Sequence, residues 1–512
     1  MDKGSLLSTP SGIQNFKAWR VHYGSMQEEI HSQFLRRGLL PGPGVVEYIM
    51  KQNDPERFIQ NAFARMSKKK DQFVVTLSDL GMDDDMSQSR AEGKVEPFCS
   101  EDTLPLVLKD YAESCMSCGD VNAFSRYFRS RLAKMKKMLP PSNVKISSIR
   151  HDMDVRITGL IARIDNGKKP GTKFIEIEDE TGSIRVYISS DLKEAAEDLL
   201  LDEVIHIQGK VPMKRDDHVK ISNGSTKRDK PIIFAEQILR PEITLRSPQN
   251  NLQGRSAVAF LSDLHVGSKT FLPDAWDRFI KWINGGDPLA KRVKTIIVCG
   301  DNVDGIGVYP GQEKDLLIVD IEEQYKTCAE LLREIREDVT VVIIPGNHDA
   351  TRPGEPQPAL PMWLRSLFKD KRFIFSGNPS LLLIEGFYIL AYHGRGIDDM
   401  VSSIRGVSYS NPERAMIEML RRRHLVPTYG KNTPIYPSEE DSLIIDVVPH
   451  IFVTGHVHAA RVSEYRGITL INASAWQSQT EYQRTKNFFP NPARVPVYDL
   501  AERHVSLLDF SS

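Results

Sequence analysis

The sequence predicts a multidomain protein that consists of a helical N-terminal module, a β-barrel of the OB type and a C-terminal α/β domain. Three observations lead to this prediction. The chain has 512 residues, which corresponds to roughly three domains at ~150 residues each. Five short segments with a β-strand pattern lie between residues 143 and 245. After Pro241, apolar β runs alternate with helical segments to the end, as in layered α/β domains.

The composition is that of an ordinary globular protein, and it excludes several classes. Lys and Arg number 67 against 68 Asp and Glu, so the net charge is -1 and any nucleic-acid site must be a local patch. Five scattered cysteines are too few for a disulfide framework. No apolar run approaches the ~20 residues of a membrane span, and the first thirty residues lack the apolar core of a signal peptide. We therefore expect a soluble cytoplasmic protein that does not act at a membrane.

Residues 1–80 are expected to form the helical module, because apolar residues between Val45 and Met66 recur at helical intervals around a cap-and-start signal at Asp54-Pro55. Residues 81–140 are expected to form a linker and a helix. The segment from Gly81 to Asp102 is polar and acidic, which is typical of a flexible linker. The helical stretch at about 119–139 contains FSRYFRSRLAKMKKML, which is either a solvated amphipathic face or a basic contact for nucleic acid.

The next domain, residues 143–245, is predicted to be an OB-fold barrel. Its five strand-like segments are Val155–Ile161, Phe174–Asp179, Ile184–Ile188, Val204–Gly209 and Ile232–Ala235. Turn signals such as Asn166-Gly167 separate them, and an apolar stretch from Asp191 to Leu201 lies between the third and fourth. This arrangement suits a small Greek-key barrel.

The loop at residues 210–230 of this domain is basic, with seven Lys or Arg residues against three Asp. Two interpretations are equally open. The loop is either a solvated hairpin or part of a groove that follows a nucleic-acid strand. In the second case Lys214, Arg215 and Lys220 are the candidate DNA-binding residues.

The last domain, residues 252–512, carries the candidate chemistry at the ends of five apolar runs. The runs and their following motifs are Ala257–Leu261 with Asp263 and His265, Thr295–Cys299 with Asp301 and Asp304, Val339–Ile344 with Asn347 and His348, Phe387–Tyr392 with His393, and Ile451–Thr454 with His456 and His458. Ligands of open α/β sheets bind at the carboxyl ends of the strands. We therefore expect these side chains to meet at one edge.

The donor types indicate a catalytic metal centre. Five of the 13 histidines lie in these motifs, together with carboxylates and one amide, and no thiolate is among them. Such a set suits Mn, Fe or Zn better than a structural Cys-rich zinc site. The two oxygens of Asp301 can bridge two ions, and two ions roughly 3.5–4 Å apart form a clamp for phosphoester hydrolysis. The expected cofactor is two divalent ions, with Mn favoured.

The ordered motifs D-x-H, G-D-x-x-D-G, G-N-H-D, H-G and G-H-x-H over residues 256–470 resemble the calcineurin-like metallophosphoesterases, whose catalytic domain is a β-sandwich flanked by helices. This resemblance implies two ligand sets: Asp263, His265, Asp301 and His458 for one ion, and Asp301, Asn347, His393 and His456 for the other. It also implies that His348 is the leaving-group histidine and Asp304 its orienting carboxylate. The physical chemistry agrees, because a non-ligating imidazole can protonate a leaving alkoxide and a carboxylate can fix its tautomer.

A wider resemblance covers residues 143–510. The segments LSDLHVGS at 261–268, LRRRHLVPTYG at 420–430 and NASAWQSQTEYQ at 472–483 are similar to the small subunits of the archaeal family D DNA polymerases. This resemblance implies a 3′–5′ proofreading exonuclease in a two-subunit replicative polymerase. The implied partners are a large catalytic subunit and single-stranded or primer-end DNA. We expect residues 143–512 alone to bind the large subunit.

Two other functions remain to be weighed. A free-standing phosphatase needs neither an OB barrel nor a basic loop, and a purely structural subunit needs no complete ligand set. A separate signal, the basic run Arg421–His424, is either a grip on DNA or the partner, or a solvated helix end.

Overall fold

In the computed structural model, the described residues are 40–41, 49, 57–60, 74–75, 104–112, 121–213, 231–245, 254–485 and 488–511. The chain divides into two units, Met1–Phe98 and Cys99–Ser512. In the first unit, β1 (Leu40–Pro41) pairs in parallel with β2 (Val74–Val75), and residues 57–60 are helical. The predicted helical module lies almost wholly outside the described residues, as does the acidic linker, so both stay predictions.

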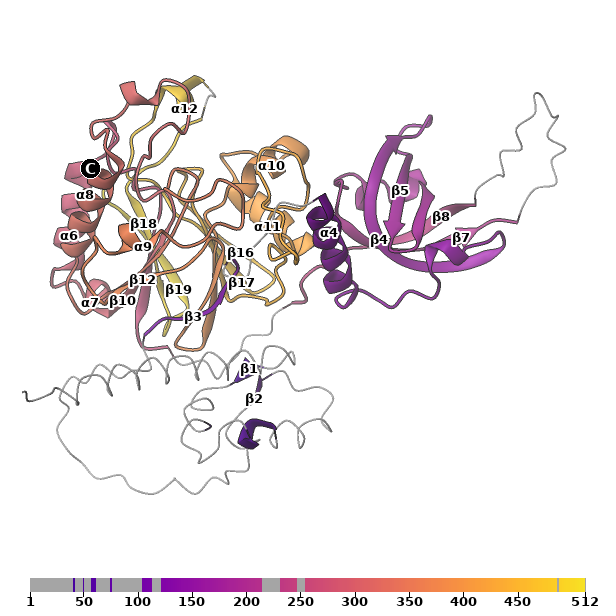
Figure 1. Ribbon diagram of the computed structural model, residues 1–512, viewed down its shortest axis with the longest axis horizontal. Coiled ribbons are helices and arrows are strands. Elements are labelled where there is room, and N and C mark those ends of the chain that lie inside the picture. Colours follow the sequence, from indigo (N-terminus) through magenta and orange to yellow (C-terminus); the bar gives the residue numbers. More distant parts are fainter. Residues whose placement is uncertain are drawn as a thin grey trace, which may run out of the picture. The chain divides into compact units, whose positions relative to one another are not determined.

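The second unit contains a closed five-stranded barrel (Figure 1). Its strands are β4 (Met153–Asn166), β5 (Lys173–Asp179), β6 (Gly182–Ile188), β7 (Val204–Val211) and β8 (Ile232–Leu239), in the order β4-β5-β6-β8-β7. The short helices η4 (Ser190–Leu192) and α5 (Lys193–Ala196) stand between β6 and β7. Alternate residues such as Ile175, Ile177 and Val186 fill the interior. The predicted OB-type barrel is confirmed.

The rest of the second unit is a sandwich of two six-stranded sheets. In order across the first sheet, the strands are β12 (Phe373–Phe375), β11 (Thr340–Ile344), β10 (Val293–Cys299), β9 (Ala257–Leu261), β18 (Arg494–Asp499) and β19 (His504–Asp509). In order across the second, they are β16 (Arg461–Tyr465), β17 (Ile468–Asn472), β15 (Ile451–Thr454), β14 (Phe387–Ala391), β13 (Ser380–Ile384) and β3 (Leu106–Asp110). Their facing residues, among them Phe260, Ile297, Leu382 and Val453, form one buried core.

Helices cover the outer faces of both sheets (Figure 1). The first sheet packs against α6 (Pro273–Ile283), α7 (Pro288–Arg292), α8 (Ile321–Arg333) and α9 (Met362–Arg365). The second packs against α10 (Gly396–Ser403) and α11 (Pro412–Arg422). The five predicted apolar runs correspond to β9, β10, β11, β14 and β15. They belong to two sheets rather than one, because the layers pack face to face.

Strand β3 was not expected, because its sequence lies in the region predicted to be a linker and a helix. It pairs antiparallel with β13, nearly 270 residues further along the chain, with Val107 opposite Leu382. Such an edge strand of five residues carries too short a pattern to be recognised locally. A fragment that begins at residue 143 would lack this strand, so the expected boundary of the partner-binding fragment has to move before Leu104.

Helix α4 (Val121–Lys136) corresponds to the predicted basic helix, but neither interpretation of it holds for its inner face. Leu132 and Met135 are buried against Leu160 and Val204 of the barrel and Ile444 of the sandwich domain. The helix therefore packs between the two domains.

Five buried charged or polar residues, Arg131, Glu203, Arg422, His424 and Asp441, join the barrel to the sandwich, and we call them the interdomain charge cluster. Arg131 Nε lies 2.6 Å from Asp441 Oδ2, and His424 Nε2 lies 2.8 Å from the same oxygen. Arg422 Nε lies 3.2 Å from Glu203 Oε2. The basic run Arg421–His424 was expected to be a solvated helix end or a grip on DNA, and both interpretations are wrong for Arg422 and His424.

No helix among the residues that the structure describes is long and apolar enough to cross a membrane.

Candidate metal centre

The structure brings the seven predicted metal ligands to one place, at the carboxyl ends of β9, β10, β11, β14 and β15. Two groups of potential ligands have donor atoms within 4.8 Å of one another. The first consists of Asp263, His265 and His458, and the second of Asp301, His393 and His456. Asn347 adjoins the second group. The predicted convergence of five strand ends is therefore observed as geometry.

The first group has lone pairs that point at one another. His265 Nε2 lies 3.1 Å from His458 Nε2, and Asp263 Oδ1 lies 3.3 Å from the same nitrogen of His458. Asp263 Oδ1 is buried and has no hydrogen-bond partner. The Nδ1 of His265 lies 2.9 Å from Asp304 Oδ1 and donates its proton there, which leaves Nε2 of His265 as an acceptor. An acceptor cluster with an orphaned carboxylate oxygen is the pattern that a cation would satisfy.

The second group is oriented in the same way. His393 Nδ1 donates to the carbonyl oxygen of Cys299 at 2.8 Å, so its Nε2 is free to bind an ion. That nitrogen lies 3.4 Å from Asp301 Oδ2 and 3.0 Å from Asn347 Oδ1. The ring of His456 is 5.1 Å from the ring of His393. One amide, one carboxylate and two imidazoles thus surround the second position.

Asp301 lies between the two groups. Its Oδ2 is 3.9 Å from His265 Nε2 in the first group and 3.4 Å from His393 Nε2 in the second. Its Oδ1 accepts the backbone N–H of His348 at 2.8 Å. Gly346 permits this close approach, since a side chain there would meet the Asp301 carboxylate. The arrangement is compatible with a carboxylate that bridges two ions.

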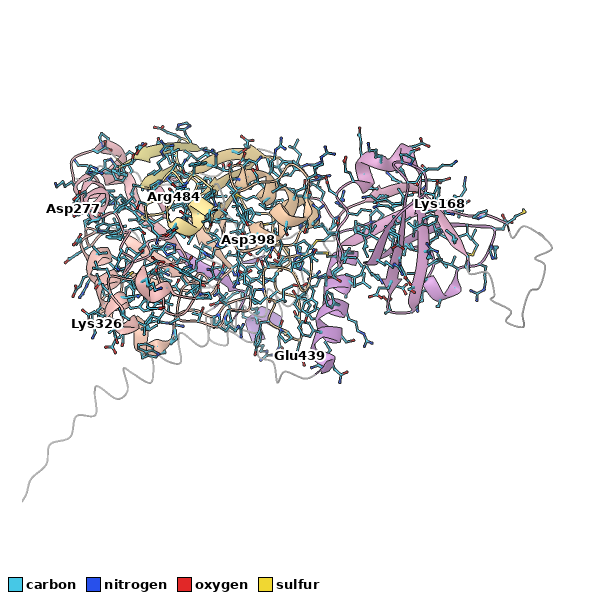
Figure 2. The ribbon with its side chains drawn as sticks, turned by 90° about the horizontal axis from the view of Figure 1, so that it is seen from above. Lys168, Asp277, Lys326, Asp398, Glu439 and Arg484 are labelled. Carbon is cyan, nitrogen blue, oxygen red and sulfur yellow. The ribbon has the colours of Figure 1, made fainter. Side chains whose placement is uncertain are left out.

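Asp398 is a member of the site that the sequence did not reveal. Its Oδ2 lies 3.0 Å from His456 Nε2, and it comes from α10 rather than from a strand end (Figure 2). A carboxylate on one imidazole nitrogen orients the ring and leaves Nδ1 of His456 for an ion. The signal was the spacing H-G-x-x-x-D at 393–398, which a helix turn brings back over the site.

The backbone at these ligands is unusual. Asp263, His265, Asp301, His456 and His458 all have positive φ, between 47° and 69°. Non-glycine residues rarely adopt this region, which costs on the order of 1–3 kcal/mol each and is concentrated at functional sites. The loops after the strands thus hold the ligands at the expense of local backbone stability.

The electrostatics of the cluster favour positive charge. Burial disfavours the charged form of His265, but Asp304, Asp301 and Asp263 outweigh it and raise its pKa to about 9. Burial likewise opposes the charge of His393, whereas Asp301 and Asp263 raise its pKa to about 10. Buried carboxylates therefore bind protons at these imidazoles when no metal is present. Metal ions and protons should compete for the same positions.

The predicted roles of His348 and Asp304 need one correction. The orienting contact of His348 is with the backbone, since its Nδ1 donates to the carbonyl oxygen of Asp304 at 2.7 Å. The Asp304 carboxylate instead accepts from His265 and from the side-chain amide of Gln312. The expectation that this carboxylate orients His348 is wrong, because the peptide after β10 turns its carbonyl toward the ring. Nε2 of His348 lies 4.0 Å from Asp301 Oδ2 and faces the ligands.

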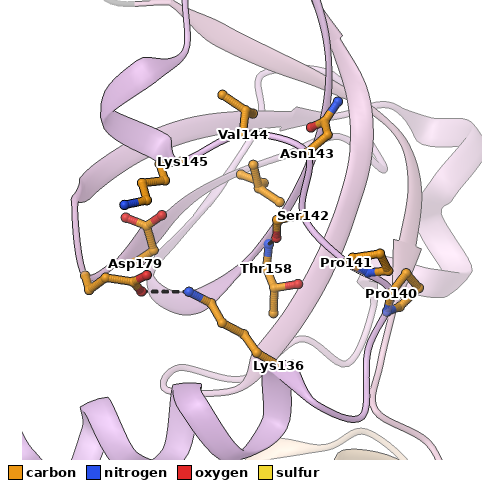
Figure 3. A pocket seen from close by; sticks show the side chains of 11 residues that line it. Lys136, Pro140, Pro141, Ser142, Asn143, Val144, Lys145, Thr158 and Asp179 are labelled. Carbon is orange, nitrogen blue, oxygen red and sulfur yellow. Dashed lines mark hydrogen bonds and ion pairs between the residues drawn. The ribbon is translucent and has the colours of Figure 1, made fainter.

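The predicted DNA-binding residues Lys214, Arg215 and Lys220 lie outside the described residues. Beside the barrel, a cleft of about 360 Å³ is lined by residues 140–145 and by the Lys136–Glu180 ion pair (Figure 3). Its lining includes none of the metal-centre residues, so it is a separate feature.

Comparison with known proteins places the chain in a class and then in a family. The profile of the family that comprises the B subunits of DNA polymerases alpha and epsilon matches residues 258–462, and that of the OB-fold nucleic acid binding domain matches residues 155–230. The barrel and the two-sheet domain thus define a non-polymerising subunit type that accompanies DNA polymerases.

Relatives named "DNA polymerase II small subunit" narrow this class. The protein of Methanothermobacter thermautotrophicus is 36% identical over 94% of this chain and 100% of its own length. Those of Thermoplasma acidophilum and Archaeoglobus fulgidus are each 40% identical, over 82% and 80% of this chain and 84% and 81% of their own. The chain belongs to the family of archaeal DNA polymerase II small subunits, as the resemblance implied. The first similarity extends into the first 140 residues, beyond the 143–510 range on which the prediction rested.

Proposed function

We propose that this chain is the metal-dependent 3′–5′ exonuclease subunit of a two-subunit replicative DNA polymerase. The observation that carries the proposal is the convergence of seven ligand-type side chains on the buried carboxylate of Asp301. A subunit with only a structural role would gain nothing from an orphaned carboxylate oxygen at Asp263 or from strained backbone at five ligands.

The donor set fits two divalent ions, with Mn favoured by its mixture of imidazoles and hard oxygens. One ion would be held by Asp263, His265, Asp301 and His458, and the other by Asp301, Asn347, His393 and His456. When bound, such ions supply Lewis-acid charge that stabilises the phosphodiester undergoing hydrolysis. Asp304 and Asp398 fix the rings of His265 and His456 for this purpose.

His348 is proposed to protonate the leaving group. Hydrolysis of the terminal phosphodiester breaks the bond between phosphorus and the 3′ oxygen of the preceding nucleotide, and that oxygen must gain a proton. The Asp304 carbonyl holds Nδ1–H of His348, so Nε2 is the nitrogen that faces the reacting group. Burial lowers the pKa of His348, which favours release of the proton from a charged ring.

The partners follow from the family and the barrel. The relatives are named small subunits of a polymerase, and we propose a large catalytic subunit as partner of this chain. A proofreading nuclease must reach an end that the polymerase has just made, and assembly raises the effective concentration of that end.

We further propose that Lys214, Arg215 and Lys220 contact the phosphates of the single strand beside the barrel. Replacing all three with Ser should weaken binding to an oligonucleotide and flatten its salt dependence, by about 0.7 in the logarithmic slope for each lost contact. Fluorescence anisotropy over a salt series measures this slope. An unchanged slope would identify the loop as a solvated hairpin.

The nuclease itself is tested with 3′-labelled single-stranded DNA and Mn²⁺, with and without the co-expressed large subunit. The Asp301→Ala chain should retain its fold by circular dichroism and lose all but about a hundredth of the cleavage rate, since both ion positions lose a shared ligand. Asp277→Ala, at an exposed acidic residue of α6, is the matched control and should cleave normally. More than a few per cent of activity in Asp301→Ala would contradict the two-ion assignment.

A further inference from the structure

The loop at residues 305–319, directly after Asp304, exposes large apolar side chains to solvent, and we call it the apolar loop. Leu317 is 73% exposed, Val319 57% and Ile306 48%, with Val308 and Tyr309 close behind. Single exposed apolar residues are ordinary on protein surfaces. Five within one short loop beside a candidate catalytic centre indicate a contact surface.

The apolar loop is fixed rather than loosely attached. Gly305 N–H donates to Gln324 Oε1 at 2.9 Å, and Nε2 of the same glutamine donates to the Ile318 carbonyl at 2.8 Å. The backbone N–H groups of Leu317 and Ile318 both donate to the carbonyl oxygen of Gly267, two residues after His265. Both ends of the loop are therefore held by buried hydrogen bonds, so its apolar side chains have a built position.

The loop also touches the proposed catalytic residues. Gln312 is fully buried and donates to the Asp304 carbonyl at 2.8 Å, while its Oε1 accepts Val308 N–H at 2.9 Å. A Cβ placed on Gly305 would lie 3.1 Å from Val308 Cγ2 and would meet the carbonyl oxygen of His348. The Val308 side chain thus lies beside the backbone of His348. The loop forms one wall at the point where the site opens.

We propose that the apolar loop is a seat for the unpaired nucleobases of the strand whose terminal phosphodiester lies at the metal centre. This inference rests on the proposed nuclease function and specifies its substrate. Nucleobases present flat apolar faces that stack on an aromatic ring such as Tyr309 and pack on aliphatic side chains. A protein seated on the loop would cover the partly exposed His348 and block the strand, which favours bases over a protein as the occupant.

The consequence is selectivity for unpaired ends. Bases of a paired primer end stack inside the duplex and cannot reach the loop, whereas a mismatched end loses that pairing at little cost. The loop would therefore favour hydrolysis of frayed or mismatched 3′ ends without reading any base edge.

The test uses the full-length chain with Mn²⁺ and two 3′-labelled single strands, identical except that one lacks the bases of its last three nucleotides. The wild type should cleave the base-bearing strand roughly 10-fold faster in kcat/KM, within the range expected for stacking of one base. The double variant Ile306→Ser/Tyr309→Ser should lose this preference and cleave the abasic strand at the wild-type rate. Tyr309→Phe should keep the preference, since the ring remains.

Trp363→Ser, at another half-exposed apolar residue, is the matched control and should behave as the wild type. A preference that survives in the double variant, or equal losses on both strands, would overturn the inference. Failure of the double variant to co-purify with the large subunit would identify the loop as a protein interface instead. Cleavage of neither strand by the wild type would contradict the nuclease proposal itself, and this inference with it.

Discussion

Two buried clusters of charged and polar side chains differ in whether their charges are balanced. In the interdomain charge cluster, Arg131 faces Asp441 and Arg422 faces Glu203, so each carboxylate has a guanidinium partner. In the metal centre, Asp263 and Asp301 face imidazole nitrogens, and no Lys or Arg side chain in the described part of the chain forms an ion pair with either carboxylate. Burying a charge without a partner is costly. The balanced cluster is therefore structural in character, and the unbalanced one is a site that takes its positive charge from outside.

The largest expected effect on catalysis, apart from loss of Asp301, comes from His348. His348→Ala should lower turnover on single-stranded DNA by about 10²–10⁴-fold, the typical contribution of a general acid. Both ions should stay bound, because His348 is not among the proposed ligands. Steady-state kinetics and metal analysis of the same preparation check both parts. Loss of an ion would show that His348 is a ligand and not the acid.

The balanced cluster should respond in stability instead. Arg131→Ala leaves Asp441 buried beside only a neutral imidazole, and breaking such a buried pair costs about 3–5 kcal/mol. Urea denaturation of the full chain measures this loss. The cleavage rate of the folded fraction should not change, since Arg131 touches no residue of the metal centre. Replacing both partners, as Arg131→Met/Asp441→Leu, should recover part of the stability, and a larger loss in the double variant would contradict the argument.

A smaller effect is expected from His424. Burial, and next the charge of Arg131, lower its pKa to about 4, whereas the unfolded residue titrates near 6.5. Between these values the unfolded chain binds a proton that the folded chain does not, so stability falls as the pH falls through this window. The total is up to about 3 kcal/mol at ~1.4 kcal/mol per pH unit.

His424→Gln removes this titration while an amide can still donate to Asp441. Stability of the wild type and the variant, measured by urea denaturation from pH 7 to pH 4, should diverge in slope, with the wild type falling more steeply. Parallel curves would show that His424 is protonated in the folded state.

The sequence predicted the barrel strands and the ligands of the metal centre well, for a physical reason. A strand that ends in Asp-x-His or Gly-Asn-His-Asp carries its pattern within a few residues, and the carboxyl ends of strands meet by topology. The missed parts depend on distant contacts. Strand β3 needs β13 as its partner, and Arg422 is recognisable as structural only beside Glu203. Similarly, which group of Asp304 meets His348 is decided by one peptide orientation after β10, which no residue pattern specifies.

The central claim is that the unbalanced cluster binds two divalent ions through Asp301. Isothermal titration of the metal-free full chain with Mn²⁺, followed by thermal unfolding at each Mn²⁺ concentration, tests it most directly. We predict two ions per wild-type chain and a melting temperature that rises with Mn²⁺, since ligands that bind only the folded state stabilise it by about 2.7 kcal/mol at 100 times their Kd. In Asp301→Ala, the stoichiometry should fall below one and the rise should vanish, with His424→Gln behaving as the wild type. A wild-type chain that binds no stoichiometric Mn²⁺ and melts at the same temperature with and without it would contradict the account.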